Sequence, residues 1–255
     1  MSTSITTIIV NGATGRVGSR LCSLASRDAS LHLAAALARP GSPSIGSPAF
    51  PVNHGENALL IADATTADAD VVIDFSSDAG VRAALSIASD RSAALLVGTT
   101  GISDQTMRML RDASDRLAIL VAPNTSLGVA AVADASARLA ASLGPEFRAS
   151  IVESHHIHKK DAPSGTALRL ADAIRGALAD PQRQLPDDQI LSIRAGDIVG
   201  EHTIRFAGPG EYVELTHRAT TRDVFALGAL RAARWLHGRG AGWWTMEDVL
   251  GFARS

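Results

Sequence analysis

The sequence is poor in cysteine and in aromatic residues. Cys22 is the only cysteine among 255 residues, so an internal disulfide is excluded, as is usual for proteins of reducing compartments. Aromatic residues make up only 4% of the chain against 46% hydrophobic residues in all, so the core has to be built mainly from Ala, Leu, Val and Ile. Cys22 lies between Leu21 and Leu24 in a helical pattern, and we interpret it as a small core residue rather than a nucleophile.

Long hydrophobic runs and an excess of one charge are also missing. No apolar run approaches the roughly 18 residues of a membrane span, and residues 1–7 lack the basic start and apolar stretch of a signal peptide. The formal net charge of -2 favours neither a nucleic acid nor an acidic membrane as partner. We therefore expect a cytoplasmic protein, in which a local cationic pocket can still bind a small anion.

The first half of the chain alternates short apolar runs with helical patterns. Five runs are candidate strands: 5–10, 31–37, 71–75, 93–97 and 117–121. Continuous apolar strands between helices are typical of a parallel sheet that is covered on both faces. The pattern predicts an α/β fold, a Rossmann-like doubly wound parallel sheet.

The pattern changes after Ser126. A helix is predicted to residue 143, and a second one begins at Ser164, with apolar positions that include Leu168, Ala171 and Leu178. Strands are predicted at 147–152, 189–194, 201–206 and 212–216, the last three without helices between them. This arrangement predicts a second, α+β domain with an open mixed sheet, to which the polar segment 153–164 belongs. Final helices from about Asp223 and Thr245 are expected to return to the first domain, which gives domains of 1–126 with 222–255, and of 127–221.

A glycine-rich turn follows the first predicted strand. Gly12, Gly15 and Gly18 are spaced G-x-x-G-x-x-G between that strand and a helix. Glycines let a backbone approach a pyrophosphate, and a helix N-terminus supplies N–H donors and positive potential. Two further turns, 98–101 and 122–125, also fall at the carboxyl ends of strands, where ligands bind in such sheets. We predict a dinucleotide site; a plain tight turn is the alternative.

The end of the second strand bears on the choice of cofactor. NAD-preferring sites usually place an acidic residue there, whereas this chain has Ala38 and then Arg39. An arginine can form two charge-assisted hydrogen bonds to a 2′-phosphate. We predict NADPH as the preferred cofactor, with NADH possible; a solvated surface arginine is the alternative.

The segment 153–168 has the highest density of chemically active residues. Three histidines and two lysines precede Ser164, which reads as a helix start, and together they predict a pocket for a carboxylate with groups able to donate protons. We expect no metal, since no cysteine or close acidic residue completes a ligand set around the histidines. A solvated basic loop is the other alternative, and His158 and Lys160 are the residues we expect to be structural or exposed.

This segment resembles the signature of the 4-hydroxy-tetrahydrodipicolinate reductases, also called dihydrodipicolinate reductases, which reads E-x-H-H-x-x-K-x-D-A-P-S-G-T-A. The resemblance extends over nearly the whole chain, through the ranges 12–18, 98–101, 122–126, 194–202, 214–217 and 246–250. It implies an NAD(P)H-dependent oxidoreductase of diaminopimelate and lysine biosynthesis, which reduces a small dicarboxylate. It also implies a substrate-binding second domain that assembles a homotetramer.

The resemblance assigns roles to individual residues. His155 would be the catalytic acid/base and Lys159 the proton donor, and His156, Ser164, Gly165 and Thr166 would hold the substrate carboxylates. The implied cofactor contacts are Gly12, Ala13, Thr14, Gly15, Arg16, Val17, Arg39, Gly98, Thr99, Thr100, Ala122, Pro123, Asn124 and Thr125.

Two departures from the family pattern keep alternatives open. Many members have an acidic residue where Ala38 stands, and many have a longer loop where this chain has 181–189. The shortened loop leaves a sibling enzyme that reduces another cyclic imine as one alternative. A non-catalytic nucleotide-sensing protein is the other, and the paired His155 and Lys159 argue against it.

Overall fold

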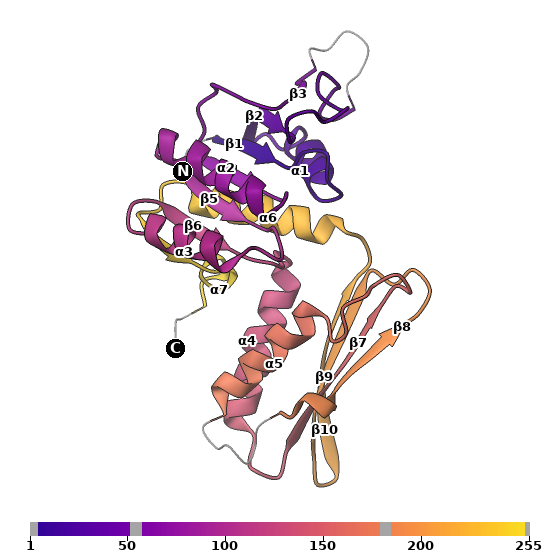
Figure 1. Cartoon of the computed structure of the whole chain (residues 1–255). Coiled ribbons are helices and arrows are strands. Elements are labelled where there is room, and N and C mark those ends of the chain that lie inside the picture. The colour runs from indigo at the N-terminus through magenta and orange to yellow at the C-terminus, as the bar shows by residue number, and fades with distance from the viewer. Residues whose placement is uncertain (1–4, 52–57, 179–184, 253–255) are drawn as a thin grey trace. The chain divides into compact units, whose positions relative to one another are not determined.

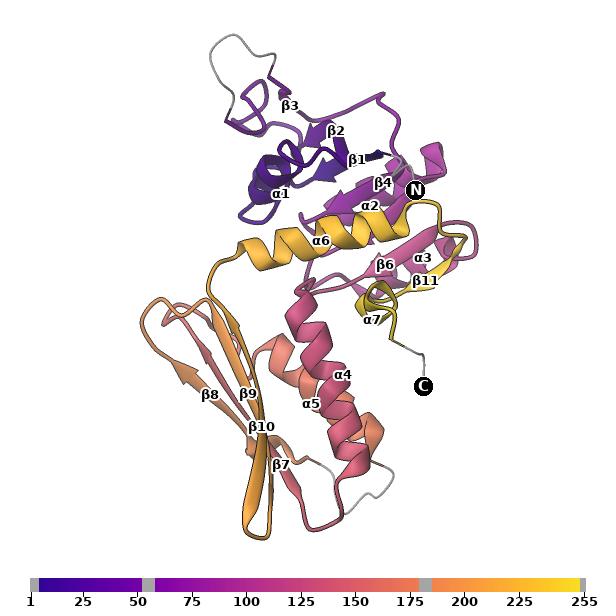
Figure 2. The same ribbon diagram turned by 180° about the vertical axis from the view of Figure 1, so that it is seen from behind.

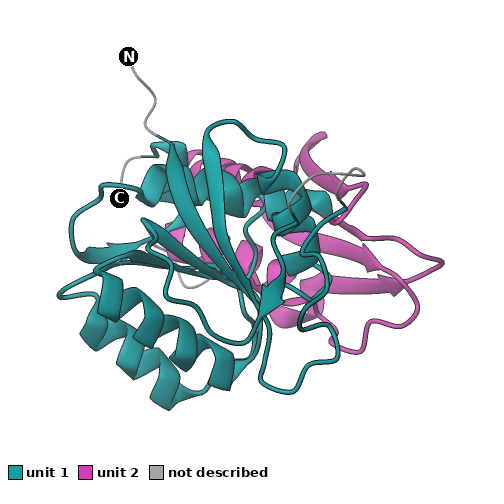
Figure 3. Cartoon of the chain, turned by 90° about the horizontal axis from the view of Figure 1, so that it is seen from above, with its two compact units in different colours: residues 1–126, 223–255 teal, residues 127–222 magenta. Residues whose placement is uncertain are grey.

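The chain folds into two compact units. The computed structural model describes residues 5–51, 58–178 and 185–252. One unit comprises Met1–Ser126 with Asp223–Ser255, and the other comprises Leu127–Arg222 (Figure 3). Among the described residues, none of the helices is both long and apolar enough to cross a lipid bilayer.

The first unit is built on a seven-stranded sheet in which all the pairings between strands are parallel. The strand order is β11-β6-β5-β4-β1-β2-β3 (Figure 1). Its strands are β1 (Thr6–Asn11), β2 (Leu31–Leu37), β3 (Ile61–Ala62), β4 (Val71–Asp74), β5 (Ala94–Val97), β6 (Ala118–Val121) and β11 (Gly242–Trp244). The predicted doubly wound α/β fold is confirmed.

Helices cover both faces of this sheet, as Figures 1 and 2 show from opposite sides. Helices α2 (Asp78–Arg91) and α3 (Asp104–Ala113) lie on one face, and α1 (Gly18–Ala25) packs with α6 (Asp223–Leu236) on the other. The short α7 (Met246–Leu250) contacts α6. Ser77 and Ser103 cap two of these helices, since they accept hydrogen bonds from the first turns of α2 and α3.

Small aliphatic side chains fill the layers, as the composition predicts. Val81, Ala84 and Leu110 from the helices pack against Val72 and Leu95 of the sheet. Cys22 is fully buried in α1, and burial raises the pKa of its thiol to about 12. Its interpretation as an inert core residue is confirmed.

The strand order reverses direction between β1 and β4. The chain runs outward from β1 through β2 to β3, and then from β4 through β5 and β6 to β11 on the other side. Ligands of open parallel sheets bind in the crevice at such a reversal, beyond the carboxyl ends of the strands. The turns after β1, β5 and β6 therefore lie at the same edge.

The second unit has a four-stranded sheet in the order β10-β9-β7-β8. β7 and β8 pair in parallel and the other pairs are antiparallel, so the predicted mixed sheet is confirmed. Its elements are α4 (Leu127–Ser142), β7 (Arg148–His155), α5 (Gly165–Ala177), the 3-10 turn η2 (Asp187–Gln189), β8 (Ile190–Arg194), β9 (Gly200–Gly208) and β10 (Glu211–Ala219). Helices α4 and α5 pack together on one face, over a core that includes Ile151, Leu170 and Ile204 (Figures 1 and 2).

Three local predictions were wrong. β7 continues through Glu153 to His155, beyond the predicted strand end at residue 152, because every second residue from Ile151 to His155 is buried while those between are only partly exposed. Leu168 is 40% exposed on α5, whose core face is formed by Ala167, Leu170, Ala171 and Ile174. Strands β3 and β11 were not predicted, since two and three residues are too few to show a period.

Candidate active site

The glycine-rich turn after β1 leaves no room for larger side chains. Gly12 has a φ of +83°, and a Cβ there would lie 2.3 Å from the carbonyl oxygen of Phe75. A Cβ on Gly18 would lie 2.0 Å from the carbonyl oxygen of Gly12. Within the described residues, no side chain caps the start of α1 at Val17, and the Ser19 N–H donates to the carbonyl of Gly15 at 2.9 Å instead. The backbone geometry by itself therefore requires glycine at Gly12 and Gly18.

A buried carboxylate connects the strand ends at this edge. Asp74, at the end of β4, is inaccessible to solvent and accepts hydrogen bonds from Asn11 Nδ2 at 2.6 Å and from Ser76 Oγ at 2.6 Å. Thr99 Oγ1 also donates to Asp74, and Ser76 N–H donates to Thr99 Oγ1 at 2.7 Å. Burial raises the pKa of Asp74 above its usual value, although these hydrogen bonds act to lower it. Asp74 and Asn11 were not identified from the sequence, because single polar residues at strand ends are common.

The residues predicted for the cofactor take up different positions around this edge. Arg16, Arg39, Thr14, Thr100 and Pro123 are exposed, whereas Ala13, Gly98, Thr99, Ala122 and Thr125 are buried. The remaining ones, Gly12, Gly15, Val17 and Asn124, are partly exposed. Thr125 donates from Oγ1 to the carbonyl of Phe225 at 2.6 Å. Thr125 thus makes a contact within its own unit, and the side chains of the buried group are enclosed by the fold.

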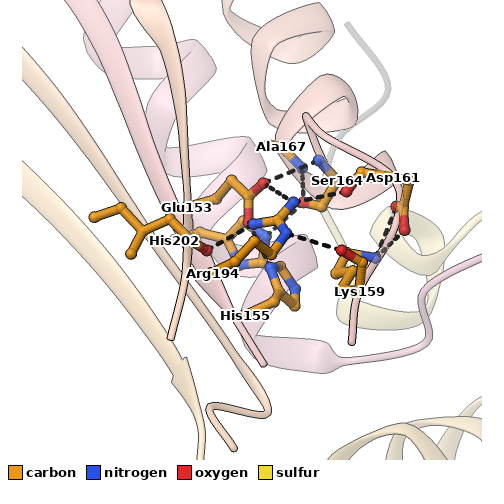
Figure 4. Close-up of polar contacts among 9 residues, drawn as sticks. Glu153, His155, Lys159, Asp161, Ser164, Ala167, Arg194 and His202 are labelled. Carbon is orange, nitrogen blue, oxygen red and sulfur yellow. Dashed lines mark hydrogen bonds and ion pairs between the residues drawn. The ribbon is translucent and has the colours of Figure 1, made fainter. Parts of the chain in front are cut away.

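The residues predicted for chemistry gather in the second unit, at the end of β7 and the start of α5 (Figure 4). His155 is 8% exposed, and its Nδ1 lies 2.5 Å from Glu153 Oε2. Lys159 Nζ bonds both carboxylate oxygens of Asp161, at 2.8 and 2.7 Å. Glu153 thus contacts His155 directly, as a hydrogen-bond partner.

Ser164 begins α5. Its Oγ accepts a hydrogen bond from Ala167 N–H at 3.1 Å and lies 3.1 Å from His202 Nε2. The next residue, Gly165, is exposed, and a Cβ built on it would meet no atom within 4 Å. Thr166 is partly exposed beside it. The Ser164 side chain is thus fixed by its contacts at the helix start, while the space over Gly165 is open. This arrangement suits an anion.

The other cationic side chains of the segment differ in exposure. His156 is partly exposed, yet its Nδ1 is buried without a hydrogen-bond partner among the described residues. His158 and Lys160 are exposed, as predicted. No group of three or more possible metal ligands occurs within the described ranges.

Arg194 and His202 complete the cluster, and neither was singled out from the sequence. Arg194 makes two hydrogen bonds to Glu153, and the rings of His155 and His202 meet edge to face with centroids 5.2 Å apart. Both residues lie about 40 positions along the chain from β7, and strand pairing alone brings them beside it. A cross-strand partner of this kind has no local sequence signal.

Charge is distributed unevenly over the cluster. Burial raises the pKa of Glu153, but the hydrogen bonds from Arg194 and His155 outweigh it and hold the pKa at about 2. Burial lowers the pKa of His155 despite Glu153, and lowers that of His202 to about 4. The resting cluster therefore holds two carboxylate anions, Glu153 and Asp161, with an arginine and a lysine around two imidazoles whose pKa values are lowered.

Known proteins resemble the chain over its whole length. Residues 6–125 match the family model described as dihydrodipicolinate reductase, N-terminus, and residues 128–250 match the corresponding C-terminus model. The 4-hydroxy-tetrahydrodipicolinate reductase of Myxococcus xanthus is 43% identical over 266 residues, which cover 97% of this chain and 98% of the relative. That of Xanthomonas axonopodis pv. citri is 42% identical over 252 residues, covering 98% and 100%.

Solved structures give the same fold. A dipicolinate-bound dihydrodipicolinate reductase from Paenisporosarcina sp. TG-14 superposes with a TM-score of 0.77 at 21% identity, over 96% of this chain and 98% of that one. With two matching family models and relatives above 40% identity, the chain belongs to the dihydrodipicolinate reductase family.

Proposed function

We propose that the chain catalyses the NAD(P)H-dependent reduction of 4-hydroxy-tetrahydrodipicolinate to tetrahydrodipicolinate, a step of diaminopimelate and lysine biosynthesis. The observation that carries this proposal is the cluster at the start of α5. There a buried histidine and a lysine flank an open helix N-terminus. The relatives of this chain are named 4-hydroxy-tetrahydrodipicolinate reductases, which supports the same reaction.

The first unit has the groups that a dinucleotide requires. Among the described residues no side chain caps the start of α1, and the backbone N–H groups of this turn, in which side chains at Gly12 and Gly18 are sterically excluded, are proposed to bind a pyrophosphate. Arg16 and Arg39 are exposed, and Ala38 beside Arg39 carries no negative charge. We infer that Arg39 binds a 2′-phosphate and that NADPH is preferred over NADH.

The start of α5 is proposed to hold the substrate carboxylates. The N–H groups of Gly165 and Thr166 begin a helix, where the macrodipole favours an anion. The open space over Gly165 leaves room for a carboxylate to approach the backbone. His156, with its unpartnered buried Nδ1, is proposed to bind beside them.

When bound, the reduced nicotinamide supplies the hydride. Hydride addition to a conjugated imine builds negative charge toward the ring nitrogen, which a nearby ammonium or imidazolium stabilises. We assign delivery of the proton to Lys159 Nζ, and acid–base work to His155. Asp161 holds the Lys159 ammonium, and its own pKa is lowered by that hydrogen bond.

Steady-state oxidation of NADPH tests the proposal. The chain should turn over 4-hydroxy-tetrahydrodipicolinate much faster than other cyclic imines, and planar pyridine-2,6-dicarboxylate should inhibit it competitively. Negligible turnover of that substrate, with faster reduction of another imine, would replace the proposal by the sibling-enzyme alternative. Cofactor binding without turnover of any imine would favour a nucleotide sensor.

A further inference from the structure

One carboxylate in the second unit connects all parts of the proposed site. Glu153 is inaccessible to solvent, and both of its oxygens are occupied. Oε1 accepts from Arg194 Nη2 at 2.7 Å and from Ser164 N–H at 3.2 Å. Oε2 accepts from Arg194 Nη1 at 3.0 Å and meets His155 Nδ1 at 2.5 Å. A buried carboxylate with this many donors holds each of them in place.

The contact with His155 decides where the imidazole carries its proton. With its pKa held at about 2, Glu153 is ionised and can only accept hydrogen bonds. His155 Nδ1 therefore has to donate, so the neutral ring has its lone pair on Nε2. The backbone of Gly200 on β9 lies beside this nitrogen, since a Cβ there would come within 3.1 Å of Nε2.

Arg194 extends the same network to the segment that carries the lysine. Its Nη2 donates to the carbonyl of Asp161 at 2.6 Å and its Nε to the carbonyl of Lys159 at 3.3 Å. Figure 4 shows the guanidinium between Glu153 and this segment. One guanidinium thus fixes the backbone on both sides of residue 160, while the Lys159 side chain is held by Asp161.

We propose that Glu153 is a positioning residue of the reaction, which fixes His155 with its proton on Nδ1 and, through Arg194, fixes the segment that carries Lys159. This inference rests on the proposed function and adds to it a residue that need not touch the substrate. It assigns to Glu153 an effect on rate rather than on cofactor binding.

The first test replaces the charge and keeps the shape. Glu153→Gln should lower kcat roughly 10–100-fold, as losses of imidazole-orienting groups do. It should leave the NADPH dissociation constant unchanged, since the proposed cofactor turn belongs to the other unit. Glu153→Asp, which retains the charge, should recover part of the loss. The matched control is Asp134→Asn, which removes the acid of an exposed Asp134–Arg138 pair in the same unit and should not change kcat.

The pH profile separates positioning from a merely structural role. The charged and titratable groups that face His155 are Glu153 on β7, Arg194 on β8, His202 on β9 and Lys159. Of these, Glu153 alone stabilises the imidazolium. Its loss should therefore shift the apparent pKa seen in kcat to lower pH, and Glu153→Asp should shift it less. A profile unchanged in Glu153→Gln would overturn the proposal.

A double-mutant cycle tests whether Glu153 acts through His155. In a His155→Ala background, Glu153→Gln should cost much less of kcat than it costs in the native background. Losses that simply multiply would contradict the proposal, because they would show that the two residues act independently.

A measurement on the native protein covers the case in which the variants do not fold. With histidine labelled by ¹⁵N, the His155 resonances should show a protonated Nδ1 and an unprotonated Nε2 in the neutral ring. The opposite tautomer would refute the assignment. If the native enzyme fails to reduce 4-hydroxy-tetrahydrodipicolinate, the proposed function is wrong, but the tautomer measurement still judges the role of Glu153.

Discussion

At the scale of single residues, the same side-chain type does different work according to its surroundings. His155, His156, His158 and His202 are all histidines of one unit, yet His158 is exposed and His202 is 3% exposed. Burial lowers the pKa of His155 and of His202, and Glu153 acts on His155 in the opposite direction. The sequence identified the cluster by its density of histidines, and the structure distinguishes its members.

Arg39 carries the prediction of cofactor preference. Arg39→Ala should weaken NADPH binding tenfold or more, because a charge-assisted hydrogen bond contributes roughly 1.5–3 kcal/mol and each 1.4 kcal/mol is about tenfold. NADH binding should stay the same, since NADH lacks the 2′-phosphate. Fluorescence titration measures both constants. Arg27→Ala, another exposed arginine of the same unit, is the control, and equal weakening of both cofactors would refute the role.

His202 makes stability depend on pH. Its pKa is about 4 in the fold against 6.5 ordinarily, because burial disfavours the charged ring. Between these values the unfolded chain binds a proton that the folded chain does not, so stability falls as the pH drops from 6.5 to about 4. The loss is on the order of 3 kcal/mol, at 1.36 kcal/mol per pKa unit.

Denaturant unfolding across this pH range checks the prediction. His202→Gln should flatten the decline, and His32→Gln, at an exposed position on β2, should not. A decline as steep in His202→Gln as in the native protein would show that other groups cause it.

At the scale of elements, the N-terminus of α5 combines a structural cap with a proposed binding site. Ser164→Ala should cost about 1 kcal/mol of unfolding free energy, as loss of an N-cap does, and should also raise KM for the substrate. Ser103→Ala removes the N-cap of α3 and should destabilise by a similar amount without changing that KM. If the two variants had equal KM values for the substrate, the N-terminus of α5 would have no role in substrate binding.

Most elements could be predicted from the sequence because their signals are local. The strand at 31–37 was placed to the residue, and the helix start at Ser164 follows from capping chemistry. The strand assignment of 153–155 failed, because a polar strand end looks like a loop until its partners are known. Glu153, Arg194 and His202 were missed as a group for the same reason, since only the pairing of β7 with β8 and β9 brings them together.

The shortened loop 181–189 lies partly outside the described residues. Its described end is tied to α5, where Arg175 Nε donates to the carbonyl of Leu185 at 2.9 Å and Arg175 Nη2 bonds Asp187 at 2.5 Å. The expected effect of this shortening on substrate contacts stays a prediction.

At the scale of the whole molecule, the second unit has one sheet face that α4 and α5 do not cover. Leu191 and Ile193 on β8 and Tyr212 on β10 are 56%, 47% and 60% exposed there. Large exposed apolar side chains on one face mark association surfaces. We propose that this face forms the homotetramer that the family resemblance implies.

Sedimentation measures that assembly directly. The native chain should sediment as a tetramer, and Ile193→Glu should dissociate it, because a charge would be buried without a partner. Leu60→Glu, an exposed apolar position of the other unit, is the control. A monomeric native chain would contradict the proposed assembly but would not contradict the proposed reaction.

The central claim is that the groups at the start of α5 perform acid–base work on a substrate reduced by a nicotinamide. The most direct measurement is the turnover of 4-hydroxy-tetrahydrodipicolinate with NADPH by the native chain, by Lys159→Ala and by Lys160→Ala, an exposed neighbour. We predict that Lys159→Ala loses at least about 100-fold in kcat with unchanged NADPH binding, while Lys160→Ala stays near the native rate. A near-native rate in Lys159→Ala, or an equal loss in both variants, would contradict the account.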